Sequence, residues 1–450
     1  MDRQTLKRKI LDAVDNLAAT IIDTGRYLYD HPELGYKEEK GTAHVAGLLG
    51  NAGYDVRSGI ARTGLMARDT SRNSGPTLAV MGELDAIICK EHPDAVPGGA
   101  VHACGHNIQT AVMSGIALAL KQAGALEHLG GNLVFMAVPA EEFVEMEFRS
   151  RLKARQEIQY FGGKQEMVAR GLMDGIDMAM MMHALNLGPG KRIFSASSGN
   201  GFIGKTVVFK GKEAHAGSAP HEGVNALNAA MLAMNNIHAQ REVFRDGDRV
   251  RVHPIITRGG DVVNVVPARV EMECYVRAAA MESLIRANAM VDRALKAGAA
   301  AVGAGIEIRD MPGYLPLRND PGMESLFLEN ADVLCRAQGT ADAIVKGGDF
   351  SGSLDFGDIS HLIPGLHPFF GGVSGSLHSK EFRLTDPDTA YLLPVKTLAL
   401  TLVDLLWDDG KEARRIITDF TPAMDKTAYL GWLEKTERKT VLDMEPCCPK

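Results

Sequence analysis

The sequence predicts an α/β protein in which a layered domain with a mainly parallel central sheet is interrupted by a smaller α+β domain. Up to about residue 198, helical stretches alternate with short apolar runs, and this pattern returns at about residue 313. Between them, residues 199–312 show half-exposed strands and two helices. Since 450 residues exceed one ordinary core, we expect a discontinuous domain, 1–198 with 313–450, and an inserted domain, 199–312.

The larger domain contains runs that are apolar on both faces, as buried central strands are. These runs are residues 78–81, 133–136 and 178–182. The polar residues that follow them are, in order, Glu83 and Asp85, Glu141 and Glu142, and His183. Because ligands bind beyond the carboxyl ends of strands in open α/β sheets, we expect these side chains along one edge.

The inserted domain is expected to be a four-stranded antiparallel sheet with two helices. The expected strands are 205–210, 249–257, 269–277 and 306–309, and the expected helices are 224–240 and 281–303. The charged tail, 410–450, ends in Cys-Cys-Pro-Lys and predicts no function.

The composition is that of a soluble globular protein, with 45% hydrophobic and 23% charged residues. A net charge of −7 gives no electrostatic footprint for nucleic acid or an anionic membrane, which favours a small-molecule partner. No segment approaches the roughly 18 unbroken apolar residues of a membrane helix, and the amphipathic start lacks the apolar core of a signal peptide. Six scattered cysteines make a poor disulfide framework, so we expect a reduced, cytoplasmic protein.

A short segment carries His102, Cys104 and His106 at every second position, before an expected helix at 110–123. Neutral imidazole and thiolate are preferred ligands of zinc and related divalent ions. The alternative is a buried cysteine between two hydrogen-bonded histidines, because this spacing is less specific than a paired Cys-x-x-Cys site. The acidic residues at the expected strand ends favour a metal site.

The adjacent carboxylates of Glu141 and Glu142 allow two distinct tasks. One can bind a metal, while the other takes a proton from an activated water and passes it to a leaving amine. The alternative is the solvated start of a helix. The positions of Asp85 and His183 at other strand ends favour the catalytic interpretation.

Gly199–Thr206 matches the phosphate-binding pattern G-x-x-x-x-G-K-[ST]. That pattern binds phosphate only between a strand and a helix N-terminus. Here a β-branched run, 207–210, follows, which favours a flexible glycine hinge between the domains over a nucleotide site.

Together, the motifs of this chain resemble the metallo-aminoacylase and carboxypeptidase G family, most closely its amidohydrolase branch, over about residues 20–405. The segments that carry the resemblance are Gly82–Ala86, His102–Asn107, Pro139–Glu142, His183, Gly211–Ala216, Asn264–Pro267 and Gly375–Glu381 with His378.

The resemblance implies two divalent ions per subunit, zinc or manganese. Their implied ligands are Cys104, His106, Glu142, His183 and His378. Glu141 would be the general base, and Asp85 would orient a metal ligand. His102 has no ligand role in the family pattern.

The resemblance also implies roles for the inserted domain, which would act as a lid and dimerisation domain. His215 would reach the active site of the other subunit of a homodimer and stabilise the developing oxyanion. Asn264 and Arg277 would bind the polar end of the substrate, Arg277 by a bidentate contact with a carboxylate.

The implied reaction is hydrolysis, by a metal-activated water, of an amide bond in a small N-acyl amino acid, an aminobenzoyl-glutamate-like conjugate or a dipeptide. One alternative is hydrolytic deamination of an aromatic amine at the same site. Another is a non-catalytic metal- or nucleotide-binding regulatory protein. Two connections are distinctive: 87–97 stands where the branch often has a short, proline-containing link, and 143–164 is longer and more charged than a minimal strand-to-strand connection. Both are expected near the mouth of the site.

Overall fold

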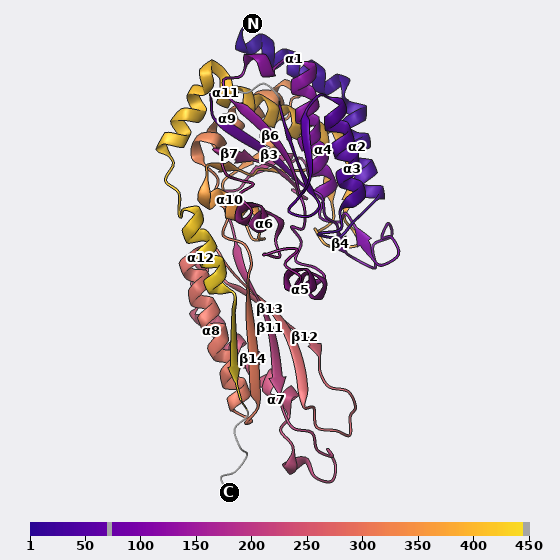
Figure 1. The fold of residues 1–450 in the computed structure, drawn as a ribbon, viewed down its shortest axis with the longest axis vertical. Coiled ribbons are helices and arrows are strands. Elements are labelled where there is room, and N and C mark those ends of the chain that lie inside the picture. Colours follow the sequence, from indigo (N-terminus) through magenta and orange to yellow (C-terminus); the bar gives the residue numbers. More distant parts are fainter. Residues whose placement is uncertain (70–73, 444–450) are drawn as a thin grey trace. The chain divides into compact units, whose positions relative to one another are not determined.

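The computed structural model describes residues 1–69 and 74–443. Its contacts divide the chain into two compact units (Figure 1). The α/β unit comprises residues 1–197, 318–349 and 358–423. The inserted unit comprises residues 198–317, 350–357 and the described residues from 424 onwards. The two cysteines of the tail, at positions 447 and 448, lie outside the described residues.

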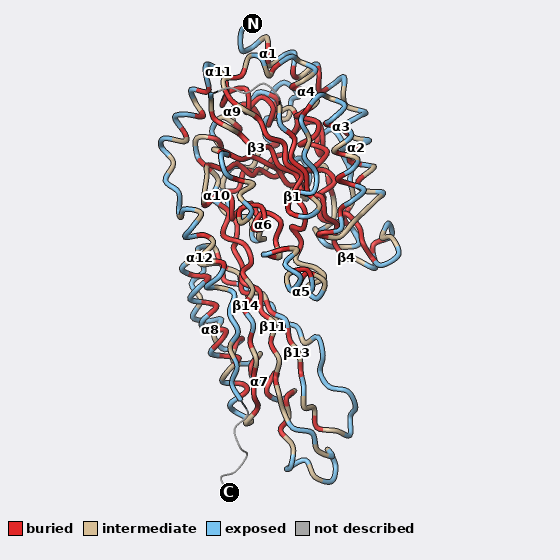
Figure 2. The backbone as a smooth tube through the Cα atoms, in the orientation of Figure 1, coloured by how far each residue is buried: buried red, intermediate tan, exposed pale blue. Residues whose placement is uncertain are grey.

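The α/β unit is built on a six-stranded sheet with the order β1-β2-β6-β3-β7-β17. The strands are β1 (Asp55–Ile60), β2 (Gly64–Arg68), β3 (Thr77–Glu83), β6 (Asn132–Val138), β7 (Met178–Met180) and β17 (Gly365–Leu366). Strand β3 runs parallel to β6 and β7, and all of its residues except Thr77 are buried. The runs that are apolar on both faces thus form the centre of the sheet, as the sequence predicts (Figure 2).

Helices pack around this sheet and fill the core of the unit. They are α1 (Arg3–Asn16), α2 (Ala18–Asp30), α3 (Glu39–Asn51), α4 (His106–Gln122), α9 (Pro321–Ala337) and α11 (Leu393–Asp419). Helix α9 begins with Pro321 after the cap Asp320, whose carboxylate accepts the amides of Gly322 and Met323.

A smaller sheet of the α/β unit has the order β15-β9-β18-β8. It consists of β15 (Ile344–Lys346), β9 (Ile193–Ser195), β18 (Phe369–Phe370) and β8 (His183–Ala184). His183 pairs with Phe369 in this sheet, and its backbone N–H donates to the carbonyl of Pro368 at 3.0 Å, which fixes its backbone shortly after β7.

One stretch, residues 388–419, is long and apolar enough to cross a membrane. It includes α11, and 89% of its most apolar window is buried inside the protein, as in the core helix of a globular domain. The expected cytoplasmic location stays a prediction.

The inserted unit contains an antiparallel sheet of five strands in the order β12-β13-β11-β14-β21. The strands are β11 (Gly201–Lys210), β12 (Arg251–Arg258), β13 (Arg269–Ala278), β14 (Gly305–Pro312) and β21 (Arg438–Leu442). Helices α7 (Ala226–Ala239) and α8 (Met281–Ala300) pack on one face, against alternate residues of β13 such as Met272 and Val276. The four expected strands and both helices are therefore present.

The fifth strand corrects the expected domain limits, which gave all of 313–450 to the larger domain. Strand β21 and helix α12 (Lys426–Thr436) belong to the inserted unit, where β21 pairs with β14. Arg438 Nε lies 2.7 Å from Asp310, and the same guanidinium contacts Asp292. The sequence could not predict this strand because its residues are mostly exposed and lack an apolar alternation.

The glycine-rich motif at 199–206 is neither a phosphate loop nor a flexible hinge. From Gly201 onwards it is strand β11, paired on both sides with β13 and β14, and no helix follows it. A Cβ at Gly201 would lie 2.7 Å from Pro316 and from the carbonyl of Tyr314. Glycine is thus needed here for close packing, and the nucleotide-binding alternative loses its structural basis.

Candidate metal centre

The acidic residues of the site lie at the carboxyl ends of parallel strands of the central sheet. Glu83 is the last residue of β3, and Asp85 follows two residues later. Glu141 and Glu142 follow the end of β6, which is parallel to β3. The expectation that these side chains gather beyond the strand ends agrees with this arrangement.

Three residues at or next to the centre have left-handed backbones. Gly105, between Cys104 and His106, caps the start of α4 with a φ of 85°. Ala140, just before Glu141, has a φ of 54°, and His378 has a φ of 62°. Left-handed conformations cost energy in residues with a Cβ and persist where the surroundings fix them, often at functional sites. The backbone N–H of His378 donates to the carbonyl of Ala103 at 2.8 Å, which places His378 beside Cys104.

All five implied ligands come together in two groups. Cys104, His106 and His183 form one, and Cys104, Glu142 and His378 form the other, so the two groups share one thiol. Cys104 Sγ lies 3.5 Å from His183 Nε2 and 3.2 Å from His378 Nε2. His378 Nε2 also lies 2.9 Å from Glu142 Oε1. Side chains separated by up to 274 residues in sequence thus converge on Cys104.

Asp85 contacts two of the implied ligands. Its carbonyl and its Oδ1 lie 2.9 and 3.2 Å from His106 Nδ1, and its Oδ2 accepts the backbone N–H of Glu142 at 2.8 Å. His183 is held in the same way, because its Nδ1 lies 2.7 Å from the carbonyl of Ala184. Each ring therefore keeps Nε2 for the centre, an arrangement common among metal-binding histidines.

The residues fit divalent metal ions. One thiol, three imidazoles and a carboxylate are donors that zinc and related ions prefer. His106 Nε2 is buried and makes no hydrogen bond of acceptable geometry among the described residues, while carboxylate oxygens of Glu83 and Glu141 lie 3.2 and 3.8 Å away, a polar setting that suits a bound cation.

The charges of the centre are strongly coupled. Burial and Glu142 oppose ionisation of Cys104, but His106, His378 and His183 outweigh them and lower the pKa of its thiol to about 6. Glu142 and Cys104 raise the pKa of His378 to about 12. Although burial opposes protonation of His106, Cys104 and Glu83 hold its pKa well above the usual range. The imidazolium groups of His106 and His378 thus offset part of the negative charge of the thiolate and the carboxylates.

These pKa values predict that metal binding releases protons. The raised pKa values of His106 and His378 would keep both rings protonated at neutral pH in protein stripped of metal, and each ring would have to lose a proton to bind a cation. Apparent affinity is therefore expected to rise with pH, by about tenfold per pH unit for each proton released. Titration calorimetry in buffers of different ionisation enthalpy measures this release, and an affinity that is constant with pH would contradict the prediction.

His102 and the site residues expected in the inserted unit belong to none of these ligand groups. His102 is buried, burial and His106 lower its pKa to about 3, and it belongs to neither ligand group. His215 and Asn264 are neighbours in the inserted unit, where the N–H of Ala216 donates to the carbonyl of Asn264 at 2.9 Å. Arg277, in β13 of the same unit, lies over the rings of Phe202 and Tyr275, 5.8 Å from each centroid.

The long connection at 143–164 supplies residues that sequence reasoning missed. It forms α5 (Met146–Ala154) and leads into α6 (Gly163–Ala169). Arg149 of α5 is fully buried and donates to the carbonyl of Glu142 and, at 2.7 Å, to that of Phe161. Lys164 of α6 is also buried and lies 2.6 Å from Glu83. The two glycines before Lys164 were the one sequence feature that could have indicated close packing here, since a Cβ at Gly163 would lie 1.7 Å from the carbonyl of Pro139.

The other long connection, at 87–97, contacts residues that follow His378 in sequence. It lies in a hairpin of β4 (Ile87–Ile88) and β5 (Ala100–Val101). His92 of this hairpin is buried, and its Nε2 lies 3.1 Å from the carbonyl of Phe382 and 2.7 Å from the guanidinium of Arg383. The hairpin therefore supports the loop that carries His378.

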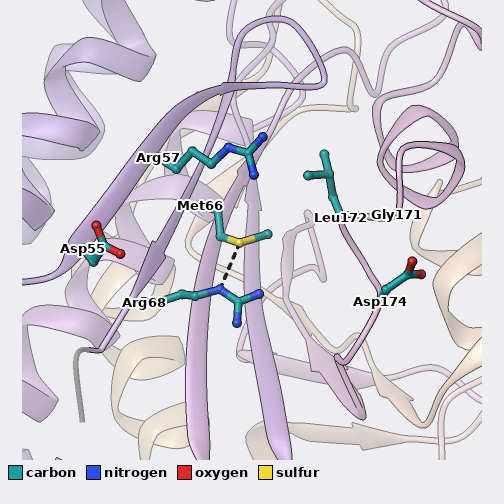
Figure 3. A pocket seen from close by; sticks show the side chains of 7 residues that line it. All are labelled: Asp55, Arg57, Met66, Arg68, Gly171, Leu172 and Asp174. Atoms are coloured by element: carbon teal, nitrogen blue, oxygen red, sulfur yellow. Dashed lines mark hydrogen bonds between the residues drawn. The ribbon is translucent and has the colours of Figure 1, made fainter. Parts of the chain in front are cut away.

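A cavity of about 290 Å³ in the α/β unit is separate from this centre (Figure 3). Its lining residues are Asp55, Arg57, Met66, Arg68, Gly171, Leu172 and Asp174. Arg57, Met66 and Arg68 lie on one side of the cavity, and Leu172 and Asp174 lie on the other. Two arginines and two aspartates balance in charge, and no expected site residue takes part.

Residues 198–302 match the family model described as a peptidase dimerisation domain. The chain is 31% identical to the human Xaa-Arg dipeptidase over 325 residues, which cover 70% of this chain and 68% of that protein. The chain belongs to the M20 peptidase family.

Other members of the M20 family match more of the chain. The mouse Xaa-Arg dipeptidase is 28% identical over 418 residues, 90% of each chain. A solved dinuclear metal-binding peptidase of the M20 family from Bacillus subtilis has the same fold, with a TM-score of 0.64 and 24% identity over 87% of this chain and 99% of that one. The family resemblance and the fold class predicted from the sequence are therefore confirmed.

As an M20 family member, the chain is a metal-dependent amidohydrolase that uses divalent metal ions. This confirms the enzyme class predicted from the motifs and contradicts the non-catalytic alternative.

Proposed function

We propose that the chain hydrolyses the amide bond of a dipeptide or a small N-acyl amino acid, with two zinc or manganese ions held by the five ligands above. The observation that carries the proposal is the pair of ligand groups that share Cys104 beside the carboxylate of Glu141. Glu141 is adjacent to the ligand Glu142, and its Oε2 lies 3.8 Å from His106 Nε2. The dipeptidases among the relatives support a dipeptide, and aminobenzoyl-glutamate-like conjugates belong to the same class of amide.

The bound ions would supply Lewis acidity that polarises the amide carbonyl and makes water more acidic. Glu141 takes the proton of the attacking water, and the hydroxide forms a bond to the amide carbon. Glu141 then gives the proton to the nitrogen as the carbon–nitrogen bond breaks, so acid and amine leave without a further reactant. A buried carboxylate next to the ligands is suited to this transfer because it is fixed and shielded from bulk water.

Residues of the inserted unit complete the proposal. His215, contributed by the second subunit of a homodimer, stabilises the oxyanion of the substrate. Arg277 binds a substrate carboxylate, and Asn264 binds its polar end. The position of the Arg277 guanidinium over the rings of Phe202 and Tyr275 favours Arg277 for this role, because the two rings restrict its movement.

A substrate screen with metal analysis tests the proposed reaction. The purified protein is expected to contain about two divalent ions per chain and to release a free amino acid from dipeptides, N-acyl amino acids or aminobenzoyl-glutamate. Release of ammonia instead would favour the deaminase alternative. A metal-loaded protein that cleaves none of these amides would contradict the proposal.

The sheet of the inserted unit favours one edge for dimerisation. Strand β21 covers β14, whereas β12 is the last strand on the other side among the described residues. Strand β12 and the loop after it expose apolar side chains: Ile255 is 59% exposed and Val263 fully so. We infer that a second copy pairs along β12, since an open apolar edge readily accepts another strand.

Charge placed on this edge is expected to weaken the dimer. Sedimentation velocity should give the mass of two chains for the unaltered protein and a shift towards one chain for Ile255→Lys. Val441→Lys is the matched control, because Val441 is similarly exposed on β21, the strand at the opposite edge of the sheet. A monomeric unaltered protein, or dissociation by the control alone, would contradict this interface.

A further inference from the structure

A buried ion pair next to the five implied ligands has no role in the proposed function so far. Glu83 ends β3, and its side chain is 1% exposed. Its Oε1 lies 2.6 Å from Nζ of Lys164, which is fully buried. Removing two charges this completely from water costs desolvation free energy. A pair at the surface would avoid that cost, so the burial of Glu83 and Lys164 calls for a further role.

The second carboxylate oxygen of Glu83 faces the metal centre. Glu83 Oε2 lies 3.2 Å from His106 Nε2, the ring nitrogen left available by the contacts of Asp85 with Nδ1. Neither Glu83 Oε2 nor His106 Nε2 has a hydrogen-bond partner of acceptable geometry among the described residues. With Glu141 they form a third group of candidate ligand atoms, all within 4.8 Å of one another.

The surrounding structure fixes Glu83 in this orientation. Its backbone N–H donates to Gln109 at 3.2 Å, and its carbonyl accepts from Thr110 at 2.5 Å, both residues of α4. Lys164 is fixed as well, because α6 begins where Gly163 packs against the carbonyl of Pro139. Lys164 takes one carboxylate oxygen and leaves the other directed at His106, as a preorganised ligand is held by its neighbours.

We propose that Glu83 is a further metal ligand, binding through Oε2 the same ion as His106, and that Lys164 is a positioning residue that holds the Glu83 carboxylate. The inference rests on the proposed function only in requiring divalent ions at this centre. It adds an oxygen donor to the ion that His106 and His183 would bind, while the other ligand group keeps the thiol of Cys104 with Glu142 and His378. Because carboxylates suit manganese and thiolates suit zinc, Glu83 should favour manganese at its site.

Metal binding by the full-length, chelator-stripped protein tests this role without any substrate. Glu83→Gln keeps the shape of the side chain and removes its charge. It is expected to weaken Mn²⁺ binding at one site by about 10- to 100-fold, with a smaller effect on Zn²⁺, and to change the visible spectrum of the Co²⁺-loaded protein. Lys164→Met should weaken Mn²⁺ binding in the same direction, because the carboxylate is no longer held.

Glu166→Gln is the matched control. Glu166 is also fully buried and pairs with a cation, Arg170, but belongs to none of the ligand groups. Its replacement should leave metal content and the Co²⁺ spectrum unchanged. If Glu83→Gln also leaves both unchanged, the carboxylate is only an ion-pair partner and the proposal is overturned.

A double variant keeps the test valid if Glu83→Gln does not fold. Glu83→Gln with Lys164→Met removes both buried charges together, which proteins tolerate better than the loss of one partner. Weakened Mn²⁺ binding in the folded double variant supports the proposal, and unaltered binding overturns it. If the unaltered protein binds metal as expected but hydrolyses no amide, the proposed function is contradicted. The inference that Glu83 is a metal ligand is not affected by that result.

Discussion

Replacement of Glu141 by glutamine is expected to slow amide hydrolysis by about 10²- to 10⁴-fold while both metal ions stay bound. Glutamine matches glutamate in shape but cannot accept the proton of the attacking water. Glu141 is adjacent to Glu142, and the two backbones are held by separate contacts, including that of Asp85 with the N–H of Glu142. The loss should therefore fall on kcat more than on KM.

The measurement is steady-state hydrolysis with the metal content determined on the same sample. Glu147→Gln is the matched control, because Glu147 lies close in sequence on the exposed side of α5. It should keep the unaltered rate. A Glu141→Gln protein with full metal content and a nearly normal rate would remove Glu141 from the mechanism.

Replacement of Lys205 by methionine is expected to destabilise the inserted unit by about 3–5 kcal/mol. Lys205 Nζ is fully buried and lies 2.5 Å from both Asp292 and Asp310. Without the ammonium, the half-exposed guanidinium of Arg438 is the remaining cation beside the two buried carboxylates among the described residues, and Asn288 donates to Asp310 at 3.3 Å. The cost arises from leaving charge uncompensated in a poorly solvated place.

Chemical denaturation of the full chain measures this effect. Lys210→Met is the matched control in the same strand, because Lys210 is 43% exposed and lies 3.2 Å from Glu307. An exposed pair of this kind is worth less than about 1 kcal/mol. Equal losses for the two variants would show that burial of the Lys205 cluster does not set its contribution.

Local patterns in the sequence predicted much of the α/β unit. Apolar runs identified β3, β6 and the region of β7, and the polar residues after each run identified Asp85, Glu142 and His183. These predictions succeed because strand burial and strand ends depend on neighbouring residues. The assignment of His378 required the family resemblance, since nothing local connects it to Cys104, 274 residues away.

The features that sequence reasoning missed depend on distant partners. Glu83 could be recognised as polar, but its pairing with Lys164 spans 81 residues. Strand β21 has little apolar character of its own and is held by β14 and by the contacts of Arg438 with Asp292 and Asp310. Gly201 looked like part of a hinge because glycine is common in loops, whereas close packing against Pro316 decides its place in a strand.

The return of the chain end to the inserted unit has a consequence for how this protein can be divided. The segment that matches the dimerisation domain, 198–302, ends before β14 and lacks β21. A fragment cut at those limits would lose Asp310 and Arg438, and Lys205 would pair with Asp292 alone. Strand β11, which carries Lys205, would then lie at an unpaired edge of the sheet. The matched segment is therefore not expected to fold by itself. An isolated inserted unit would need residues from three separate segments of the chain.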